Sequence, residues 1–446
     1  MSDAPGGSRF QARAGLLSVM GLIYASGCGG PYGTEDFVGQ TGPGLLILLL
    51  FVLPWFWSVP MALATAELSA MRPVEGGYYR WVREIFGEFW GFQAGTWAII
   101  ASFLDNALYP VLFGKSLRHW FPGMPDWQQG LAAVGFILVL TFLNYRGIEI
   151  VGATSVLLSL FLMAPLVWIV IAGFSSARFN PLVPFRAPGV DGLDGFGSGL
   201  ALAMWFYSGM TEISTASEEI KRPARVIPLA FVLVVPIIIL SYAAPTLAGL
   251  AAVGNWQGWT SGYFAEIGRV LGGRVLETWS FLGSVASYAV IFLAYLVWYS
   301  RLCWAMAEDR SLPKVLARLH PRYGTPHVAL FCYAVIYSIL VWVPFERLLV
   351  VDMWLTGAYC TTTLALLVRL RAKGAGHPGG FQVPGGKAGA WIVVLLPAFT
   401  WVVALYVTAR DNWIAGTTAL LIGTVIYAIL KWVRSLRRRV GVPPEP

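Results

Sequence analysis

The stretch "GCGGPYGTED", residues 27–36, interrupts an apolar run that begins near Ala14 and resumes after Phe37. It contains four glycines and one proline, residues that weaken or end a helix. Inside a membrane, unwound backbone is tolerated only where protein buries it or where it lines a water-filled cavity. We therefore expect this stretch to line an internal site. The simpler alternative is that the glycines permit close helix packing and Pro31 bends the helix.

The composition of the chain is that of a membrane protein. Hydrophobic residues make up 57% of it and charged residues 12%, far from the averages of soluble domains. Apolar runs of about 20 residues with a helical period recur from end to end, which favours helices over a β-barrel. We predict an all-α polytopic membrane protein in which residues 1–446 form a single transmembrane domain. The twelve expected spans are residues 14–38, 43–69, 88–113, 128–145, 150–174, 197–219, 226–253, 272–306, 326–343, 347–370, 388–408 and 413–434.

The distribution of basic residues predicts the orientation of the chain. If both termini are cytoplasmic, 23 of the 31 Lys and Arg residues fall in cytoplasmic segments. Basic residues near helix ends resist translocation, so this bias favours that orientation. It explains the net charge of +8 without nucleic acid as a partner, and the basic tail could touch anionic lipid head groups. We expect an integral protein of the plasma (inner) membrane; nothing in the sequence indicates an oligomeric state.

A second apolar run is interrupted in the same way. In "MWFYSGMTEIST", residues 204–215, the pair Ser208-Gly209 lies halfway along the run, and Gly209 follows Gly29 by 180 residues. Each break lies in the first helix of a five-helix unit, which is typical of an inverted repeat with its ligand between the breaks. Freed N–H groups would favour a carboxylate and freed carbonyls an ammonium group. The first repeat, the second repeat and the remaining helices would cover about residues 14–174, 197–371 and 388–434.

Several carboxyl groups fall inside the expected spans or at their ends. Carboxylates at that depth usually face a cavity or carry protons, and basic residues are nearly absent there. This excess of acids favours a cationic ligand or a proton as co-substrate. Asp105 and Glu212 adjoin the expected site, whereas Glu67 has an equal alternative in a structural partner among the loop arginines. The candidates for proton coupling are Glu212, Glu35 and Glu67.

Other classes of protein are disfavoured. The four cysteines lie singly in apolar runs, which indicates neither a disulfide framework nor a metal cluster. Neither H-E-x-x-H nor G-x-S-x-G occurs, so we expect no catalytic residues, no metal and no cofactor. A channel remains an alternative, although a channel would be expected to repeat its filter residues in several subunits. Two unlike breaks within one chain favour a carrier of a small molecule.

Five longer stretches carry a family pattern. They are "GGPYGTED" (29–36), "WSVPMALATAELSAMRPVEGGYYRWV" (57–82), "GFQAGTWAIIASFLDNALYPVLF" (91–113), "SEEIKRPARVIP" (217–228) and "AEDRSLPKVLARLHPRYGTP" (307–326). Together they resemble the amino acid–polyamine–organocation (APC) superfamily, in particular its L-type amino-acid and plant-type polyamine transporters. The resemblance covers most of the chain. It implies a LeuT-type fold with a 5+5 inverted repeat, in which helices 1 and 6 are discontinuous.

The same resemblance implies a substrate pocket. Carried over position by position, the pocket residues are Cys28, Gly29, Gly30, Asn106, Tyr109, Trp205, Phe206, Ser208, Thr211 and Tyr295, with Asp105 beside them. An aromatic side chain at Tyr295 could cover the substrate. Plant polyamine transporters carry acids at the positions of Thr211 and Tyr295, and both are uncharged here. This departure counts against a polyamine, which needs acids at both ends of its site, although Glu212 could compensate.

The expected function is secondary active transport of amino acids, cationic or neutral, by alternating access. The α-carboxylate would lie on the N–H groups near Gly29 and Gly30, and the α-ammonium on the carbonyls of residues 205–208. The span 150–174 lacks Lys and the span 272–306 lacks an adjacent Ser/Thr pair, which predicts sodium independence. Proton symport and substrate exchange both stay open. The alternative substrate is a polyamine, taken up by a carrier of the same fold.

Overall fold

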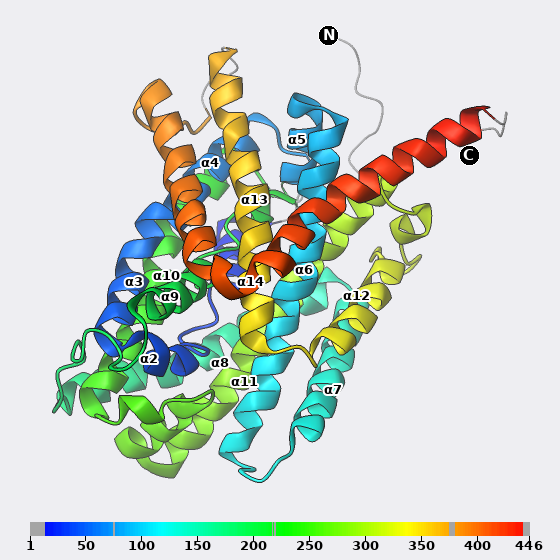
Figure 1. Cartoon of the computed structure of the whole chain (residues 1–446). Helices are drawn as coiled ribbons and strands as arrows, with labels where there is room; N and C mark the ends of the chain where they lie inside the picture. Colours follow the sequence, from blue (N-terminus) through cyan, green and yellow to red (C-terminus); the bar gives the residue numbers. More distant parts are fainter. Residues whose placement is uncertain (1–13, 75, 216, 218–219, 374–379, 440–446) are drawn as a thin grey trace.

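The structure, a computed structural model, describes residues 14–74, 76–215, 217, 220–373 and 380–439. Within these residues the regular structure is helical, apart from one isolated β-bridge between Ala14 and Ile220. Figure 1 shows the helices gathered into one bundle. The helices are α1 (Leu16–Gly27), α2 (Glu35–Thr41), α3 (Pro43–Phe56), α4 (Ser58–Met71), α5 (Gly77–Phe86), α6 (Glu88–Ser116), α7 (Asp126–Tyr145), α8 (Ile148–Ser175), α9 (Gly192–Phe206), α10 (Pro223–Ala252), α11 (Tyr263–Glu308), α12 (His327–Leu340), α13 (Phe345–Ala372) and α14 (Gly386–Arg439).

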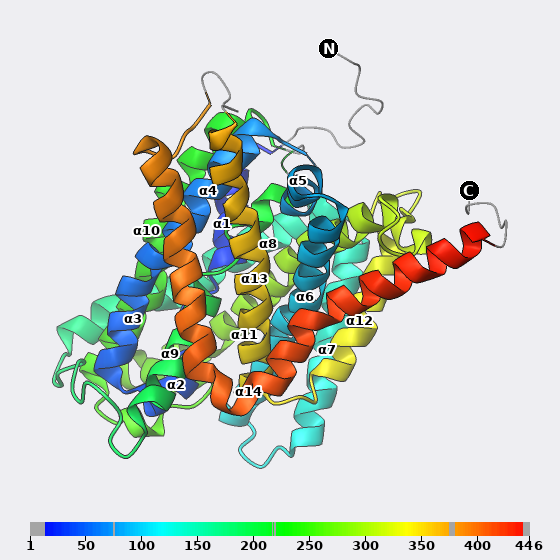
Figure 2. The ribbon, with the colours of Figure 1, turned by 45° about the horizontal axis from the view of Figure 1, so that its top comes forward.

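Nine helical segments of the described chain are long enough and apolar enough to cross a membrane. Two of them lie in α14, at Gly386–Thr408 and Asn412–Trp432, and Figures 1 and 2 show a sharp bend between these halves. The three other expected spans fall short of spanning length: the two interrupted ones and the 14-residue α12. The all-helical architecture is as predicted, whereas the count of twelve spans and the 5+5 repeat stay predictions.

The first break is present where the sequence predicts it. α1 ends at Gly27 and α2 begins at Glu35, so the backbone of residues 28–34 lies outside any helix. It turns through Gly30 and Gly33, whose φ angles are +78° and +106°. These angles lie in the left-handed region, which glycine adopts without the steric cost of a Cβ atom. The glycines are therefore required by the path of the chain.

The second break is also present, and it touches the first. α9 ends at Phe206, and a short 3-10 turn begins at Glu212, with Gly209 between them at a φ of +84°. A Cβ atom at Gly209 would lie 2.7 Å from the carbonyl oxygen of Ser26 and 2.5 Å from the hydroxyl of Tyr295. Real Cβ atoms do not approach other atoms so closely. The two interrupted helices can therefore meet only because position 209 carries no side chain.

Burial separates the inner helices from the outer ones. In their most apolar windows, 83% of the residues of α11 and 72% of those of α13 are buried, against 28% for Ile150–Ser175 and 11% for Asn412–Trp432. Large apolar side chains such as Leu138 of α7 and Leu157 of α8 are exposed. Apolar outward faces of this kind suit contact with lipid. α1 lies inside the bundle, packed against α10 and α11 (Figure 2).

α11 consists of two helices joined at a kink. Gly272 and Gly273 have non-helical backbone angles, with a φ of +62° at Gly273. The part before the kink lies over the first break, because the ring of Phe264 meets that of Tyr32 edge to face, with 5.6 Å between centroids. This part of α11 therefore covers the α2 end of the break.

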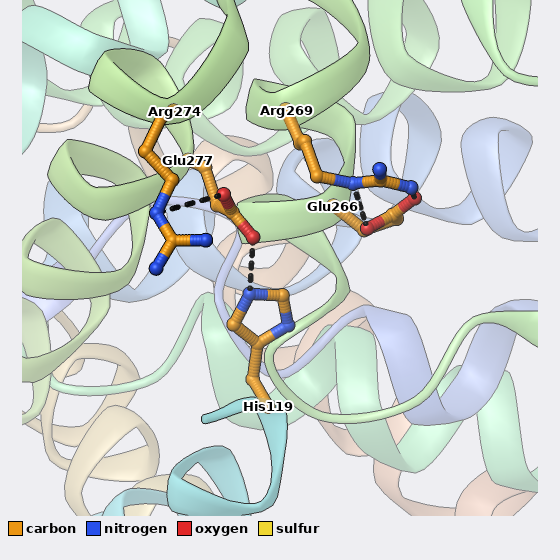
Figure 3. Close-up of polar contacts among 5 residues, drawn as sticks. All are labelled: His119, Glu266, Arg269, Arg274 and Glu277. Atoms are coloured by element: carbon orange, nitrogen blue, oxygen red, sulfur yellow. Dashed lines mark hydrogen bonds and ion pairs between the residues drawn. The ribbon is translucent and has the colours of Figure 1, made fainter. Parts of the chain in front are cut away.

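Polar contacts link the residues after the kink to the end of α6 (Figure 3). His119, just after α6, places Nε2 3.1 Å from Oε1 of Glu277, and Nε of Arg274 lies 3.9 Å from Oε2. Glu266 and Arg269 form a separate ion pair on the turn before the kink. The contact of His119 with Glu277 therefore ties the start of the second part of α11 to the segment that follows α6.

A buried ion pair joins α4 to α13. Nε and Nη2 of Arg371 donate to the two carboxylate oxygens of Glu67 at 2.8 and 2.6 Å, and the N–H of Val383 donates to Oε2 at 2.6 Å. The side chains of Glu67 and Arg371 are 2% and 12% exposed. The pair therefore connects α4, α13 and the segment that leads into α14.

Gly30→Ala should destabilise the protein, because an L-residue at a φ of +78° costs about 1–2 kcal/mol and the new Cβ would lie 2.8 Å from Cδ1 of Leu166. Gly39→Ala is the matched control, since a Cβ at Gly39 meets nothing within 4 Å. Thermal unfolding in detergent, followed by Trp fluorescence, should show a lower midpoint for Gly30→Ala only. Equal midpoints for the two variants would contradict the left-handed turn.

Arg371→Gln should lower the unfolding midpoint strongly, because removing one partner of a buried ion pair costs about 3–5 kcal/mol. Arg369→Gln provides the control: Arg369 is exposed and lies over the ring of Phe86 at 5.2 Å. That variant should change stability by less than about 1 kcal/mol. The same thermal unfolding assay applies, and similar midpoints for both variants would mean that the Glu67–Arg371 pair does not stabilise the fold.

Candidate functional site

The two breaks enclose a small cavity. Its volume is about 20 Å³, which leaves room for about one water molecule. Binding of a larger molecule therefore requires that the surrounding side chains move. The cavity is lined by Ser26, Gly27, Cys28, Gly29, Gly30, Tyr32, Tyr109, Leu112, Trp205, Phe206, Tyr242, Ser287, Tyr288, Ile291 and Tyr295.

The unwound backbone of the first break has partners of unequal strength. The hydroxyl of Ser287 donates to the carbonyl of Gly29, so this carbonyl is already occupied. The N–H of Gly30 donates to the sulfur of Cys28 at 3.3 Å, and sulfur is a weak acceptor. The Gly30 N–H is therefore the more available group for an incoming ligand.

An aromatic row lies beside the cavity. The ring of Tyr109 on α6 stacks with Trp205 of α9 at 5.5 Å between centroids and with Tyr295 of α11 at 6.1 Å. Tyr295 stacks in turn with Tyr299, one helical turn along, at 5.1 Å and an interplanar angle of 8°. The faces of aromatic rings carry partial negative charge and attract cations. Three helices therefore contribute to one surface that suits an ammonium group.

Asp105 lies against this row and is 6% exposed. Nε1 of Trp205 donates to Oδ1 at 2.7 Å, and the hydroxyl of Tyr299 donates to Oδ2 at 2.6 Å. Both donors are neutral. They orient the carboxyl group and leave any negative charge on it without a compensating cation.

Glu212 lies directly after the second break and is 1% exposed. Its carboxylate accepts from the hydroxyl groups of Tyr359 at 3.1 Å, Thr211 at 3.2 Å and Tyr78 at 3.3 Å. Tyr78 belongs to α5 and Tyr359 to α13, and their rings stack at 5.3 Å. Neutral hydroxyl groups from two helices therefore hold this acid beside the break.

Asp352 on α13 is an acid that the sequence analysis missed. It is 1% exposed, and Oδ1 accepts from Thr356 at 3.2 Å, while Oδ2 has no hydrogen-bond partner among the described residues. Asp105 and Glu212 are the charged groups that act on it. The rule that selected the other acids, a carboxyl group inside an apolar span, also applies to Asp352 and would have found it.

Three buried acids, Asp105, Glu212 and Asp352, form a group that has no basic partner among the described residues. In the part of the chain that the structure describes, no Lys, Arg or His side chain forms an ion pair with any of them. A buried carboxylate without a counter-charge is costly. A bound cation or protons would compensate for the charge.

Four of the expected pocket residues do not line the cavity: Asp105 and Thr211, whose contacts are given above, and Asn106 and Ser208. Nδ2 of Asn106 donates to the hydroxyl of Tyr337 at 3.3 Å. The hydroxyl of Ser208 donates to the carbonyl of Met204 at 2.7 Å and accepts from Nε1 of Trp57 at 3.2 Å. Movement of the break would be needed to bring either side chain to a ligand.

The three candidates for proton coupling lie in different surroundings. Glu212 belongs to the group of three acids, and Glu67 is held in the ion pair with Arg371. Glu35 is fully buried at the start of α2 and accepts from the N–H of Gly33 at 2.6 Å. The role of each in coupling stays a prediction.

Known proteins resemble the chain along nearly its whole length. A family model described as "Amino acid permease" matches residues 15–430. Polyamine transporter RMV1 of Arabidopsis thaliana is 34% identical over 427 residues, covering 94% of this chain and 85% of the relative. Polyamine transporter PUT1 of Oryza sativa subsp. japonica is 33% identical over 452 residues, covering 99% and 83%. An uncharacterized transporter of Mycobacterium tuberculosis is 29% identical over 319 residues, 70% of each chain. The chain therefore belongs to the amino acid permease family of the APC superfamily, and it is a transporter.

Proposed function

We propose that this transporter carries polyamines, organic cations with two or more amino groups, by alternating access between its two interrupted helices. The group of Asp105, Glu212 and Asp352 supports this proposal, because several buried acids that have no basic partner in the described part of the chain suit a ligand with several positive charges. Protein groups that only needed internal stability would be expected to pair with a basic side chain, as Glu67 does.

Acids at other positions compensate for the two uncharged residues that counted against a polyamine. Thr211 and Tyr295 are uncharged, yet Glu212 follows Thr211 and Asp352 adds a carboxyl group from α13. The number of acids that a polyamine requires is thus supplied from other positions. The relatives RMV1 and PUT1, at 34% and 33% identity, are named as polyamine transporters, which supports the same substrate class.

The aromatic row supplies the second requirement of such a substrate. A polyamine carries methylene segments between its amino groups, and the rings of Tyr109, Trp205 and Tyr295 can pack against these segments. A cation over an aromatic face gains about 0.5–2 kcal/mol, more when water is excluded. Neutral amino acids would gain little from either the acids or the ring faces.

A cationic amino acid is the second candidate. The N–H of Gly30 has only a weak sulfur acceptor and could bind an α-carboxylate, while the acids bind the positive groups. For either substrate, we propose a fold of twelve spans in a 5+5 repeat with both termini in the cytoplasm. We also propose that transport is independent of sodium and that the protein lies in the plasma (inner) membrane. A channel would not need the closed cavity of about 20 Å³ between the breaks.

Purified protein in liposomes loaded with unlabelled putrescine should accumulate labelled putrescine by saturable counterflow. Putrescine brings two ammonium groups for the three acids, so it should compete better than arginine, and leucine should not compete. Asp352→Asn removes one of the acids and should raise the KM for putrescine at least about tenfold, or about 1.4 kcal/mol. Asp126→Asn is the control, because that side chain is 89% exposed.

The outcomes of this experiment separate the candidates. Counterflow of arginine without counterflow of putrescine would establish the cationic amino acid instead. An electrical conductance of the liposome membrane that does not saturate with putrescine concentration, measured separately, would indicate a channel. An unchanged KM in Asp352→Asn would remove Asp352 from the substrate site.

Uptake should depend on pH, and Glu212→Gln should flatten this dependence, because an amide cannot gain or lose the proton. The groups that face Glu212 are Tyr78, Tyr359, Thr211 and the more distant charge of Asp105, so a change at the break alters its surroundings. Initial uptake rates across the acidic-to-neutral range provide the measurement. Asp126→Asn, at an exposed side chain, should keep the shape of the wild-type profile, whereas parallel profiles for wild type and Glu212→Gln would exclude Glu212 from coupling.

A further inference from the structure

A fourth buried acid, Glu35, lies at the start of α2, directly after the first break. Glu35 is 0% exposed; its Oε2 accepts from the N–H of Gly33 at 2.6 Å. Its Oε1 is buried and has no hydrogen-bond partner among the residues that the structure describes. Among the described residues, Oε1 is therefore the carboxyl oxygen that remains available to a ligand.

Two tyrosine hydroxyl groups near Glu35 are also unused. The hydroxyl groups of Tyr32 and Tyr288 are buried, and each lacks a hydrogen-bond partner within the described chain. The two rings meet edge to face with 6.5 Å between their centroids, and Glu35 interacts electrostatically with both hydroxyl groups. One acid and two hydroxyl oxygens thus form a set of acceptors at the first break.

The neighbouring acid does not belong to this set. Asp36 accepts from the N–H of Ser261 at 2.6 Å and from its hydroxyl at 2.5 Å, and Lys115 lies 3.7 Å away. Lys115 is shared with Glu346, at 3.6 Å. In the described residues no basic side chain pairs with Glu35, so its charge is left for something else to compensate.

Residues of the set and a partner of Asp105 line the same cavity. Tyr32 and Tyr288 line it at the first break, and Trp205, whose indole N–H donates to Asp105, lines it as well. Glu35 and Asp105 are not among the lining residues, so a linear molecule would meet these acids only after the lining side chains move.

A glycine on α11 keeps this end of the cavity in place. A Cβ atom at Gly283 would lie 2.8 Å from the hydroxyl oxygen of Tyr32. Any side chain at position 283 would therefore push the Tyr32 hydroxyl away from its present position. Close packing therefore holds the Tyr32 hydroxyl in position, although it has no hydrogen-bond partner among the described residues.

We propose that Glu35, with the hydroxyl groups of Tyr32 and Tyr288, forms a second ammonium subsite that binds the distal amino group of the substrate. The subsite makes the transporter select substrates that carry two separated positive charges over those that carry one. This inference rests on the proposed transport of polyamines and assigns one end of the substrate to a place in the fold. It gives Glu35 a role in binding, where the sequence suggested proton coupling.

The test compares amines of one and two charges as competitors of labelled putrescine in proteoliposomes. Butylamine, putrescine, 1,8-diaminooctane and spermidine are the competitors, and wild type, Glu35→Gln and Asp36→Asn are the proteins. In Glu35→Gln, the half-inhibition concentration of the best diamine or triamine should rise at least about tenfold, equivalent to about 1.4 kcal/mol. The half-inhibition concentration of butylamine should stay unchanged. Asp36→Asn should behave as wild type, because Asp36 contacts Ser261 and Lys115 outside the set.

Tyr288→Phe is the second variant, in case Glu35→Gln does not fold. It removes one acceptor and keeps the ring, so it should weaken the diamines in the same direction by a smaller factor, again without an effect on butylamine. Equal losses for butylamine and the diamines, or no loss for any amine, would overturn the subsite. A pH profile that flattens in Glu35→Gln with unchanged competition would return Glu35 to proton coupling.

The design separates this inference from the proposed function. Polyamine transport is tested by wild type alone, since competition by diamines there does not depend on any variant. The subsite is tested by the difference between wild type and Glu35→Gln. If no amine competes in wild type, both proposals fall, and if amines compete equally in both proteins, only the subsite falls.

Discussion

The contact between the two interrupted helices is the constraint on which the site depends. Gly209 approaches the carbonyl of Ser26 and the hydroxyl of Tyr295 so closely that a Cβ atom has no room. Backbone unwound inside a membrane must find its hydrogen-bond partners within the protein. Here Ser287 supplies one of them for the carbonyl of Gly29. Because the breaks meet, the cavity and the acid that follows the second break, Glu212, are brought together.

The chain treats buried acids in two different ways. Glu67 receives the Arg371 guanidinium in a bidentate ion pair, which joins α4 to α13. Within the described residues, Asp105 and Glu212 accept only from neutral Trp, Tyr and Thr side chains, and Oδ2 of Asp352 has no hydrogen-bond partner. A basic side chain paired with these acids would occupy the position that a cationic substrate needs. Neutral donors orient an acid and leave its charge available to a substrate that must bind and then leave.

The aromatic side chains give the site its second property, which is closure. Tyr109, Trp205 and Tyr295 pack against one another, and the space that remains beside them is about 20 Å³. A substrate can enter only if these rings turn or the helices that carry them move. Since the rings come from α6, α9 and α11, such a movement involves both breaks. Binding and rearrangement of the interrupted helices are thereby linked through the same side chains.

Much of this arrangement follows from the sequence alone. Apolar runs predict helices because hydropathy and glycine content act locally, and so the breaks at residues 27–36 and 208–209 could be read directly. The same local rule indicated Asp105, Glu212, Glu35 and Glu67 as buried acids. Their partners come from residues far away in the chain: Glu67 pairs with Arg371, one residue beyond the expected span 347–370 and in the last turn of α13, so it has the structural partner that the sequence offered as an alternative. Only the packing of α6, the second break and α13 decided that Asp105, Glu212 and Asp352 would form one group, because contacts between distant segments leave no local pattern in the sequence.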